Sequence, residues 1–462
     1  MAEFVTTHAE LGEDFYVPVS QATPPKVILR YRNQKAAEAI GVGELSDAQW
    51  CQHFGHFAPF KGSFDKPLAL AYHGHQFGHY NPDIGDGRGF LFAQLTEPLT
   101  GRLLDFGTKG TGQTPFSRQG DGCLTLKGAV REVLATEMLT ALGVNSSQTF
   151  CVVETGRALI RHDEPSPARS AMLTRLSHSH IRIGSFQRHS YLQNPAANEA
   201  LARYVVRHYY PQRDANAPLA ELIPTLLSDL AKKVAVMAGG WMAGGFVHGV
   251  LNTDNFNITG ESFDYGPWRF LPHLDPNFTA AYFDEQGRYA YGRQPDAALW
   301  ALCRFADCFI EQVEQEALEG ALQSFFADME SAMVAAMMRR LGLKSGDGVA
   351  IMNALLKAAR QTRCSFDGMF FDLYGGVTGN KEVYAGEAFA PYFAAVADVP
   401  AAGRLLRDHA YFEGEQAASL VIDEVEALWA PIAENDDWSL FEKKLAHIRS
   451  YGAALARFER ED

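Results

Sequence analysis

Three oxygen-bearing side chains lie close together in the middle of the chain. Asp254 and Asn255 end the segment HGVLNTDN (248–255), and Asp264 follows in FDYGP. Carboxylate and amide oxygens suit Mg²⁺ or Mn²⁺, so Asn255 and Asp264 are candidate metal ligands. Asp254 is then free to act as a general base. The alternative is a simple turn, because Asn and Asp often bond their own backbone.

The spacing of these residues is similar to that of the catalytic motifs of protein kinases. His248 takes the histidine position of HRDxxxxN, Asn255 takes the position of the metal-binding asparagine, and Asp264 begins DYG where a kinase has DFG. Val250, however, stands where a kinase has its catalytic aspartate. The pattern predicts a phosphate-handling site whose proton acceptor lies elsewhere.

A glycine-rich segment, IGDGRGF (84–90), directly precedes a predicted strand. Gly85 and Gly87 would let backbone amides approach a phosphate group. Arg88 adds a guanidinium that can bind phosphate oxygens in a bidentate manner. An ordinary hairpin turn is the alternative for this segment.

Two apolar runs on either side of TEPLTG predict a pair of strands, and Lys109 ends the second of them. Residues 126–143 repeat apolar side chains at spacings of three and four, which predicts a helix that carries Glu132 and Glu137. In a protein kinase, a glycine loop, a lysine strand and a glutamate helix follow each other in this order, and the glutamate pairs with the lysine. A solvated lysine at a strand end is the alternative.

Arg175 and Arg182 lie seven positions apart in LTRLSHSHIRIGSF, with few acidic residues nearby in the sequence. Two arginines that bracket a Ser/His-rich turn suit a clamp for phosphate oxygens, although a surface ion pair is the usual role of one arginine. A second glycine turn, GDG (120–122), either adds nucleotide contacts through Asp121 and Gly122 or serves only as a turn.

Three histidines in YHGHQFGHY, namely His73, His75 and His79, form a pattern that could hold a metal ion. Neither a nearby cysteine nor an HExxH glutamate accompanies them. We therefore expect these histidines to pack or to form hydrogen bonds.

The bulk composition limits the class of protein. The chain has 462 residues, 47% of them hydrophobic, which is enough for a large core in two lobes. A net charge of -14 argues against nucleic acid or an anionic membrane as a partner. Six cysteines without CxxC pairs, and an N-terminus without a signal-peptide pattern, favour the cytoplasm. The uncharged run 234–251 contains glycines and a histidine, so we expect a buried helix rather than a membrane span.

Together the motifs resemble those of the selenoprotein O family, kinase-like proteins that transfer AMP from ATP to protein hydroxyls. The likeness runs from about residue 68 to residue 295, through AYHGHQFGHYNPDIGDGRG, KGTGQTPFSRQGDG, REVLATEML, LTRLSHSHIRIGSF, FVHGVLNTDN and FDYGP. The resemblance implies an α+β, protein-kinase-like fold of two lobes. A β-rich N-terminal lobe would span 1–165, and a mainly helical C-terminal lobe 166–462.

The resemblance also implies a role for each candidate residue. The nucleotide would contact Gly85, Gly87, Arg88, Lys109, Asp121, Gly122, Arg175, Arg182 and Asp264. Glu132 would orient Lys109, Asn255 and Asp264 would bind Mg²⁺ or Mn²⁺, and Asp254 would accept the proton. In that family the nucleotide lies reversed relative to ordinary kinases, so that the α-phosphorus faces the acceptor and pyrophosphate leaves. A displaced acceptor would explain why Val250 replaces the usual base.

The implied reaction is AMP transfer from ATP to Ser, Thr or Tyr hydroxyls of other proteins and of the enzyme itself. Three alternatives stay open: UMP transfer from UTP, γ-phosphoryl transfer by a protein kinase, and a catalytically silent nucleotide-binding scaffold. The chain departs from the family pattern after the second glycine turn, in GDGCLTLKGAVREV. It also ends in ALARFERED, without the cysteine or selenocysteine common in the family, so redox control there is not expected.

Overall fold

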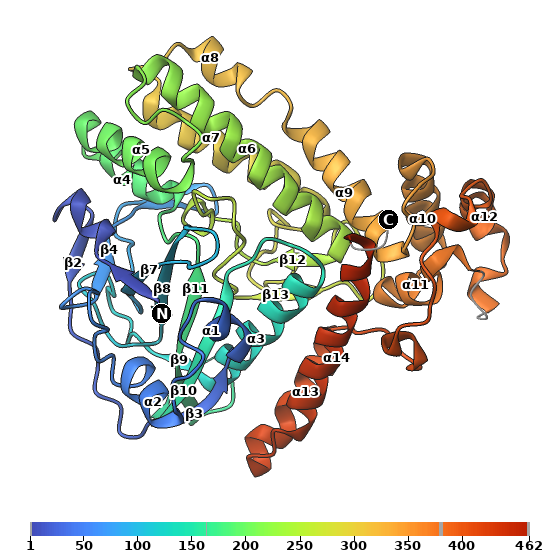
Figure 1. Cartoon of the computed structure of the whole chain (residues 1–462), viewed down its shortest axis with the longest axis horizontal. Helices are drawn as coiled ribbons and strands as arrows, with labels where there is room; N and C mark the ends of the chain where they lie inside the picture. The colour runs from blue at the N-terminus through green and yellow to red at the C-terminus, as the bar shows by residue number, and fades with distance from the viewer. Residues whose placement is uncertain (1, 163, 378–381, 460–462) are drawn as a thin grey trace.

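A computed structural model of the chain describes residues 2–162, 164–377 and 382–459. The fold is α+β, with a sheet-rich N-terminal part and a helical C-terminal part (Figure 1). The main sheet, within the described residues, is built from β1 (Glu3–Val5), β2 (Tyr16–Pro18), β3 (Ile28–Arg32), β4 (Leu68–Leu70), β7 (Leu91–Thr96), β8 (Leu103–Lys109), β9 (Leu124–Thr125), β10 (Gln148–Leu159) and β11 (Ala168–Ser177). Its order is β2-β4-β7-β8-β11-β10-β3, with β1 beside β7 and β9 beside β11.

The strands expected on either side of TEPLTG are confirmed. They are β7 and β8, which pair in an antiparallel register with Leu95 opposite Leu104. The predicted division of the chain at residue 165 remains a prediction. The sheet itself continues to Ser177, because β11 pairs with both β8 and β10.

One face of the sheet is covered by α3 (Leu126–Ala141), as the apolar spacing predicts. The Thr125 side chain caps the first turn of α3 by accepting a hydrogen bond from the Gly128 amide, and Gly143 follows the helix at a φ of 80°. The opposite face packs against α1 (Gln34–Ala39) and α2 (Asp47–Phe54), where Trp50 stacks on Phe150 with ring centroids 4.9 Å apart. The central strands are therefore buried on both faces.

The buried helix expected over 234–251 is confirmed as far as residue 244, as the second half of α6 (Leu219–Gly244), whereas residues 246–248 form a strand. Gly245 ends it in the left-handed conformation, at a φ of 65°. The chain then forms β12 (Phe246–His248), the short helix η2 (Thr253–Asn255) and β13 (Trp268–Phe270), and β12 pairs with β13. Asp254 and Asp264 therefore both lie on the segment that connects β12 to β13. No helix in the described ranges is long and apolar enough to cross a membrane.

Helices dominate the rest of the chain: α4 (Ile183–Tyr191), α5 (Pro195–Tyr209), α7 (Gln294–Ala306), α8 (Gln315–Gly320), α9 (Phe325–Leu341), α10 (Gly348–Thr362), α11 (Phe366–Asp372), α12 (Ala390–Ala397), α13 (Ile422–Asn435) and α14 (Ser439–Ala456). Figure 1 shows α14 running beside α3, the helix that carries Glu132. An ion pair between Arg449 of α14 and Glu137 joins the two helices. The last helices of the chain therefore support the sheet-rich part.

Candidate active site

The predicted motifs meet at one cavity of about 490 Å³, lined by residues of the sheet, by the loops that contain residues 84–90 and 116–123, and by the connection between β12 and β13. Its walls include most of the predicted site residues, namely Gly85, Gly87, Arg88, Lys109, Asp121, Gly122, Arg175, Arg182, Asp254 and Asp264. Glu132 and Asn255 are not part of the lining. Glu132 lies behind it, next to Lys109 and Arg175, and Asn255 directly follows Asp254 in the chain.

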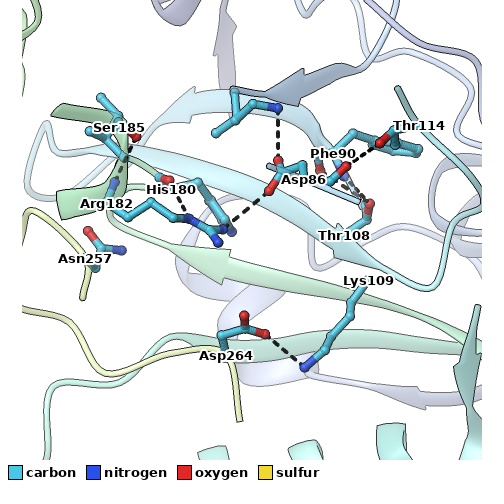
Figure 2. Close-up of polar contacts among 12 residues, drawn as sticks. Asp86, Phe90, Thr108, Lys109, Thr114, His180, Arg182, Ser185, Asn257 and Asp264 are labelled. Carbon is cyan, nitrogen blue, oxygen red and sulfur yellow. Dashed lines mark hydrogen bonds and ion pairs between the residues drawn. The ribbon is translucent and has the colours of Figure 1, made fainter. Parts of the chain in front are cut away.

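Lys109 lies at the centre of a buried charged cluster. Its Nζ atom is 2.7 Å from Glu132 Oε2 and 3.0 Å from Asp264 Oδ1. Figure 2 shows the lysine pointing toward Asp264. The predicted lysine–glutamate pair therefore forms, and Glu132 rather than Glu137 makes it, because Glu137 bonds Tyr31 and Arg449 instead.

Strand pairing places Arg175 in the same cluster. Lys109 of β8 lies opposite Leu173 of β11, and Arg175 lies opposite Gly107. Because directly paired and alternate residues share a face of a sheet, Lys109 and Arg175 both point toward Glu132. Arg175 Nη2 is 3.2 Å from Asp264 Oδ1 and 3.9 Å from Glu132 Oε1.

Asp264 is held as a carboxylate. Burial opposes its charged form, but the neighbouring Lys109 and Arg175 outweigh burial and hold its pKa well below the usual range. Its backbone adopts a φ of 60°, which is uncommon for a residue other than glycine. An acidic side chain at a strained backbone position, beside two cations, is typical of a functional site.

Arg182 stands at the start of α4 and is buried against aromatic rings. Its guanidinium lies 4.2 Å from the Tyr72 ring centroid and 5.0 Å from that of Phe263, and its Nη2 is 3.5 Å from Asp86 Oδ1 (Figure 2). Acidic side chains that are absent from the local sequence therefore lie next to both arginines in space. Asp86 and Asp264 come from distant segments of the sequence, so the local spacing could not show them.

The first glycine segment packs against residues 116–117, which precede the second glycine turn. A Cβ atom on Gly85 would lie 2.5 Å from the Phe116 ring, and one on Gly122 would lie 2.2 Å from the Gly112 carbonyl oxygen, so both positions require glycine. Ser117 Oγ donates a hydrogen bond to the Gly87 carbonyl. Asp121 receives two hydrogen bonds from Arg161, at 2.8 and 3.2 Å. The second turn therefore forms a wall of the cavity.

Asp254 has the properties that a general base needs. Its carboxyl group lines the cavity, and its buried Oδ1 atom accepts no hydrogen bond from the described residues. Burial raises the pKa of Asp254 to about 6, although the positive charge of Arg182 limits the rise. A carboxylate with this pKa can take up a proton near neutral pH.

The Asn255 side chain is held by one hydrogen bond through its nitrogen. Its Nδ2 atom donates to the Val250 carbonyl at 2.9 Å, which leaves a buried Oδ1 atom without a hydrogen-bond partner among the described residues. No group of three His, Cys, Asp or Glu side chains in the described ranges is arranged to hold a metal ion. A cation bound by Asn255 and Asp264 would need water or substrate oxygens as its other ligands, which is the usual way that Mg²⁺ binds.

Comparisons with known proteins agree with the motifs. The model of the family described as "Protein adenylyltransferase SelO" matches residues 1–449. The chain belongs to this family. Relatives called "Protein nucleotidyltransferase YdiU" in Gloeobacter violaceus and Synechocystis are 39% and 37% identical to it, over 97% and 95% of this chain and 95% and 96% of the relatives. Membership in the SelO family makes the chain an enzyme of the nucleotidyltransferase class.

The SelO family match extends well beyond the 68–295 segment that carries the motifs. It includes α13 and most of α14, which pack on the Glu132 helix. The family match therefore covers the helical C-terminal part as far as residue 449. Helix α14 holds its place through burial of Leu445 and Ile448 against the same core as α3.

Three acidic or arginine residues of the cavity were not predicted from the sequence: Asp86, Arg118 and Arg161. Arg118 has a φ of 55°, and its charge acts to lower the pKa of Asp254. Both Asp86 and Arg118 lie inside motifs that were noticed, GDGRG and FSRQGDG. A charged side chain close to a glycine turn was the feature of the sequence that could have identified Asp86 and Arg118 as site residues.

Two histidines of YHGHQFGHY, His73 and His75, form the hydrogen bonds expected of them, whereas His79 is exposed. His73 Nδ1 lies 2.8 Å from the Tyr80 hydroxyl, and His75 Nδ1 lies 2.7 Å from Gln187 Nε2. They support the hairpin of β5 (Gly74–Gln76) and β6 (His79–Asn81). The His75 amide also donates to Thr253 Oγ1, so this hairpin braces the loop that carries Asp254.

Proposed function

We propose that the enzyme transfers AMP from ATP to Ser, Thr or Tyr hydroxyls of proteins. The observation that carries this proposal is the position of Asp254. Its buried carboxyl group shares one cavity with a glycine turn and with the cations Lys109, Arg175 and Arg182. Because Val250 offers no acidic group, Asp254 is the proton acceptor that this arrangement favours.

In the proposed reaction, the acceptor oxygen forms a bond to the α-phosphorus while Asp254 takes the hydroxyl proton. The bond between the α-phosphorus and the bridging oxygen breaks, and its electrons leave with pyrophosphate. Lys109, Arg175 and Arg182 line the cavity where negative charge grows on that leaving group. Arg88 contributes a further cation, and its guanidinium makes no hydrogen bond or ion pair in the described ranges.

The charges of the cavity support a role for a divalent cation. Three cations face three carboxylates: Lys109, Arg175 and Arg182 against Asp86, Glu132 and Asp264. This buried cluster has no formal excess of positive charge, so Arg88, Arg118 and a bound divalent cation would together offset the charge of a triphosphate. We propose that Asn255 and Asp264 hold Mg²⁺ or Mn²⁺, which would neutralise the phosphates.

We also propose that the architecture is a two-lobed, protein-kinase-like one. The pair Lys109–Glu132 between a strand and a helix, the glycine turn before it, and Asn255 and Asp264 after it correspond in order to the parts of a kinase site. All six cysteines are free thiols, which supports our proposal that the enzyme acts in the cytoplasm.

Intact-mass analysis tests the proposed reaction. After incubation with ATP, Mn²⁺ or Mg²⁺ and a protein extract, acceptor proteins and the enzyme itself should gain the mass of AMP. Parallel reactions with UTP show whether the enzyme selects the base, since the named cavity residues address mainly phosphate. A gain of one phosphate group alone would instead identify a kinase.

The rate of transfer should depend on the charge of Asp254. Because the base must be deprotonated and its pKa is raised to about 6, kcat should fall as pH decreases through about 6, by about tenfold per unit below it. Initial rates between pH 5 and pH 8 measure this acidic limb of the pH–rate profile. The residual activity of Asp254→Asn should lack the limb, and an identical limb in that variant would assign it to another group.

A further inference from the structure

A second groove lies beside the catalytic loop. Its volume is about 630 Å³, and Phe77, Phe283 and Trp300 form its aromatic walls. Phe283 is 47% exposed and the adjoining Tyr282 is 83% exposed, so large apolar surfaces are uncovered there. Exposed aromatic side chains around a hollow are typical of surfaces that bind other proteins.

The groove and the nucleotide cavity share a wall. Gln76 lines the cavity, while the next residue, Phe77, lines the groove. The Phe77 amide donates to Asn252 Oδ1 at 3.0 Å, and the Tyr289 hydroxyl donates to the same oxygen at 2.9 Å. Since Asn252 directly precedes Thr253 and Asp254, a chain bound in the groove would lie next to the proton acceptor.

The charges of the groove favour a basic occupant. Its three acidic residues are Asp284, Glu285 and Asp296, its two arginines are Arg288 and Arg293, and His79 also lines it. The Asp284 carboxylate accepts hydrogen bonds from the backbone amides of residues 288 and 289. The Arg293 guanidinium donates hydrogen bonds to the carbonyls of residues 286 and 287. Arg288 lies over the Trp300 ring, 4.9 Å from its centroid.

Two carboxylates remain for a ligand. Glu285 and Asp296 are exposed, and neither forms an ion pair with a described residue. Resting on the proposed function, we propose that this groove binds the acceptor protein beside its reactive hydroxyl. It selects an extended segment with an apolar side chain for the aromatic walls and a lysine or arginine for Glu285 and Asp296.

A randomised peptide library with one fixed tyrosine tests this proposal. Peptides retained by immobilised enzyme should be enriched in basic and apolar residues. The double variant Glu285→Lys, Asp296→Lys should reverse the charge preference, with about a tenfold loss of basic peptides and a gain of acidic ones. Phe283→Ser should remove the apolar preference, and folding is not at risk because the side chain is half exposed.

The matched control is Glu413→Lys, Glu415→Lys, which makes the same change of charge at two exposed acids outside the groove. It should keep the wild-type preference. An unchanged preference in the groove variant, or an equal change in the control, would overturn the proposal. So would a dimer that sedimentation shows to be lost in Phe283→Ser, because a second copy would then occupy the groove.

Transfer of label from α-³²P-ATP to the same peptides separates the two proposals. If basic peptides bind but never receive AMP from the wild type, the proposed function fails and the acceptor role of the groove fails with it. If AMP enters peptides without any charge preference, the function stands and the groove assignment alone is wrong.

Discussion

Asp264→Ala should abolish nucleotide transfer. Asp264 is the carboxylate that the cations Lys109 and Arg175 keep ionised, and we propose that it holds the divalent cation with Asn255. Its loss would remove the anchor of the metal–nucleotide complex. Transfer assays with saturating ATP and Mn²⁺, together with nucleotide-binding isotherms, measure both effects.

A second substitution separates chemistry from stability. Asp264→Ala removes a carboxylate from a buried charged cluster and leaves alanine at a φ of 60°, so some stability should be lost. Asp264→Asn keeps the shape, and asparagine tolerates this backbone conformation. We expect Asp264→Asn to be folded and inactive, whereas Asp47→Ala, which breaks an exposed ion pair with Arg32, should keep full activity. An active Asp264→Asn variant, or activity that survives EDTA, would contradict the metal assignment.

Asp254→Ala should lower kcat by about two to four orders of magnitude, the usual range for loss of a positioned base. Nucleotide should still bind, because the cations that face the phosphates remain. Val250→Asp in the same chain should not restore activity, since a carboxylate at that position would face a different acceptor geometry. Rescue by Val250→Asp would indicate an ordinary kinase arrangement.

Asp254, which we expect to raise kcat, should lower the stability of the fold. A folded-state pKa of about 6, against the ordinary value of 3.8, means that the fold disfavours the charged form. At pH 7 to 8 that cost is fully present, and it disappears as the pH falls below about 4. Asp254→Asn should therefore raise the free energy of unfolding at pH 7 by about 2 to 3 kcal/mol, from about 1.4 kcal/mol per pKa unit. Denaturant unfolding of both proteins at pH 7 and pH 4 measures this difference, which should shrink at pH 4.

Local patterns in the sequence predicted the elements that depend on local physics. The apolar spacing in 126–143 predicted α3, and the glycines after α6 fit the tight turn into β12, because periodicity and backbone conformation are properties of neighbouring residues. The pair Lys109–Glu132 was predicted from the order of motifs.

Contacts between distant segments were beyond the sequence pattern. The Asp86–Arg182 pair joins residues that are 96 positions apart, and the N-terminal strand β3 pairs with β10, which lies more than a hundred positions later in the chain. Phe116 packs on Gly85 only because the two glycine turns fold together. Such contacts arise from tertiary packing, which no spacing within one segment encodes.

The fate of the ATP phosphates tests the central claim most directly. Purified enzyme, Mn²⁺ or Mg²⁺ and a protein extract would receive ATP labelled either at the α-phosphorus or at the γ-phosphorus, with Asp254→Asn as the control of strongly reduced activity. AMP transfer predicts that α label enters protein, including the enzyme itself, and that γ label is released as pyrophosphate. Incorporation of γ label without α label would contradict AMP transfer and establish phosphorylation, and incorporation of neither label would leave a nucleotide-binding scaffold.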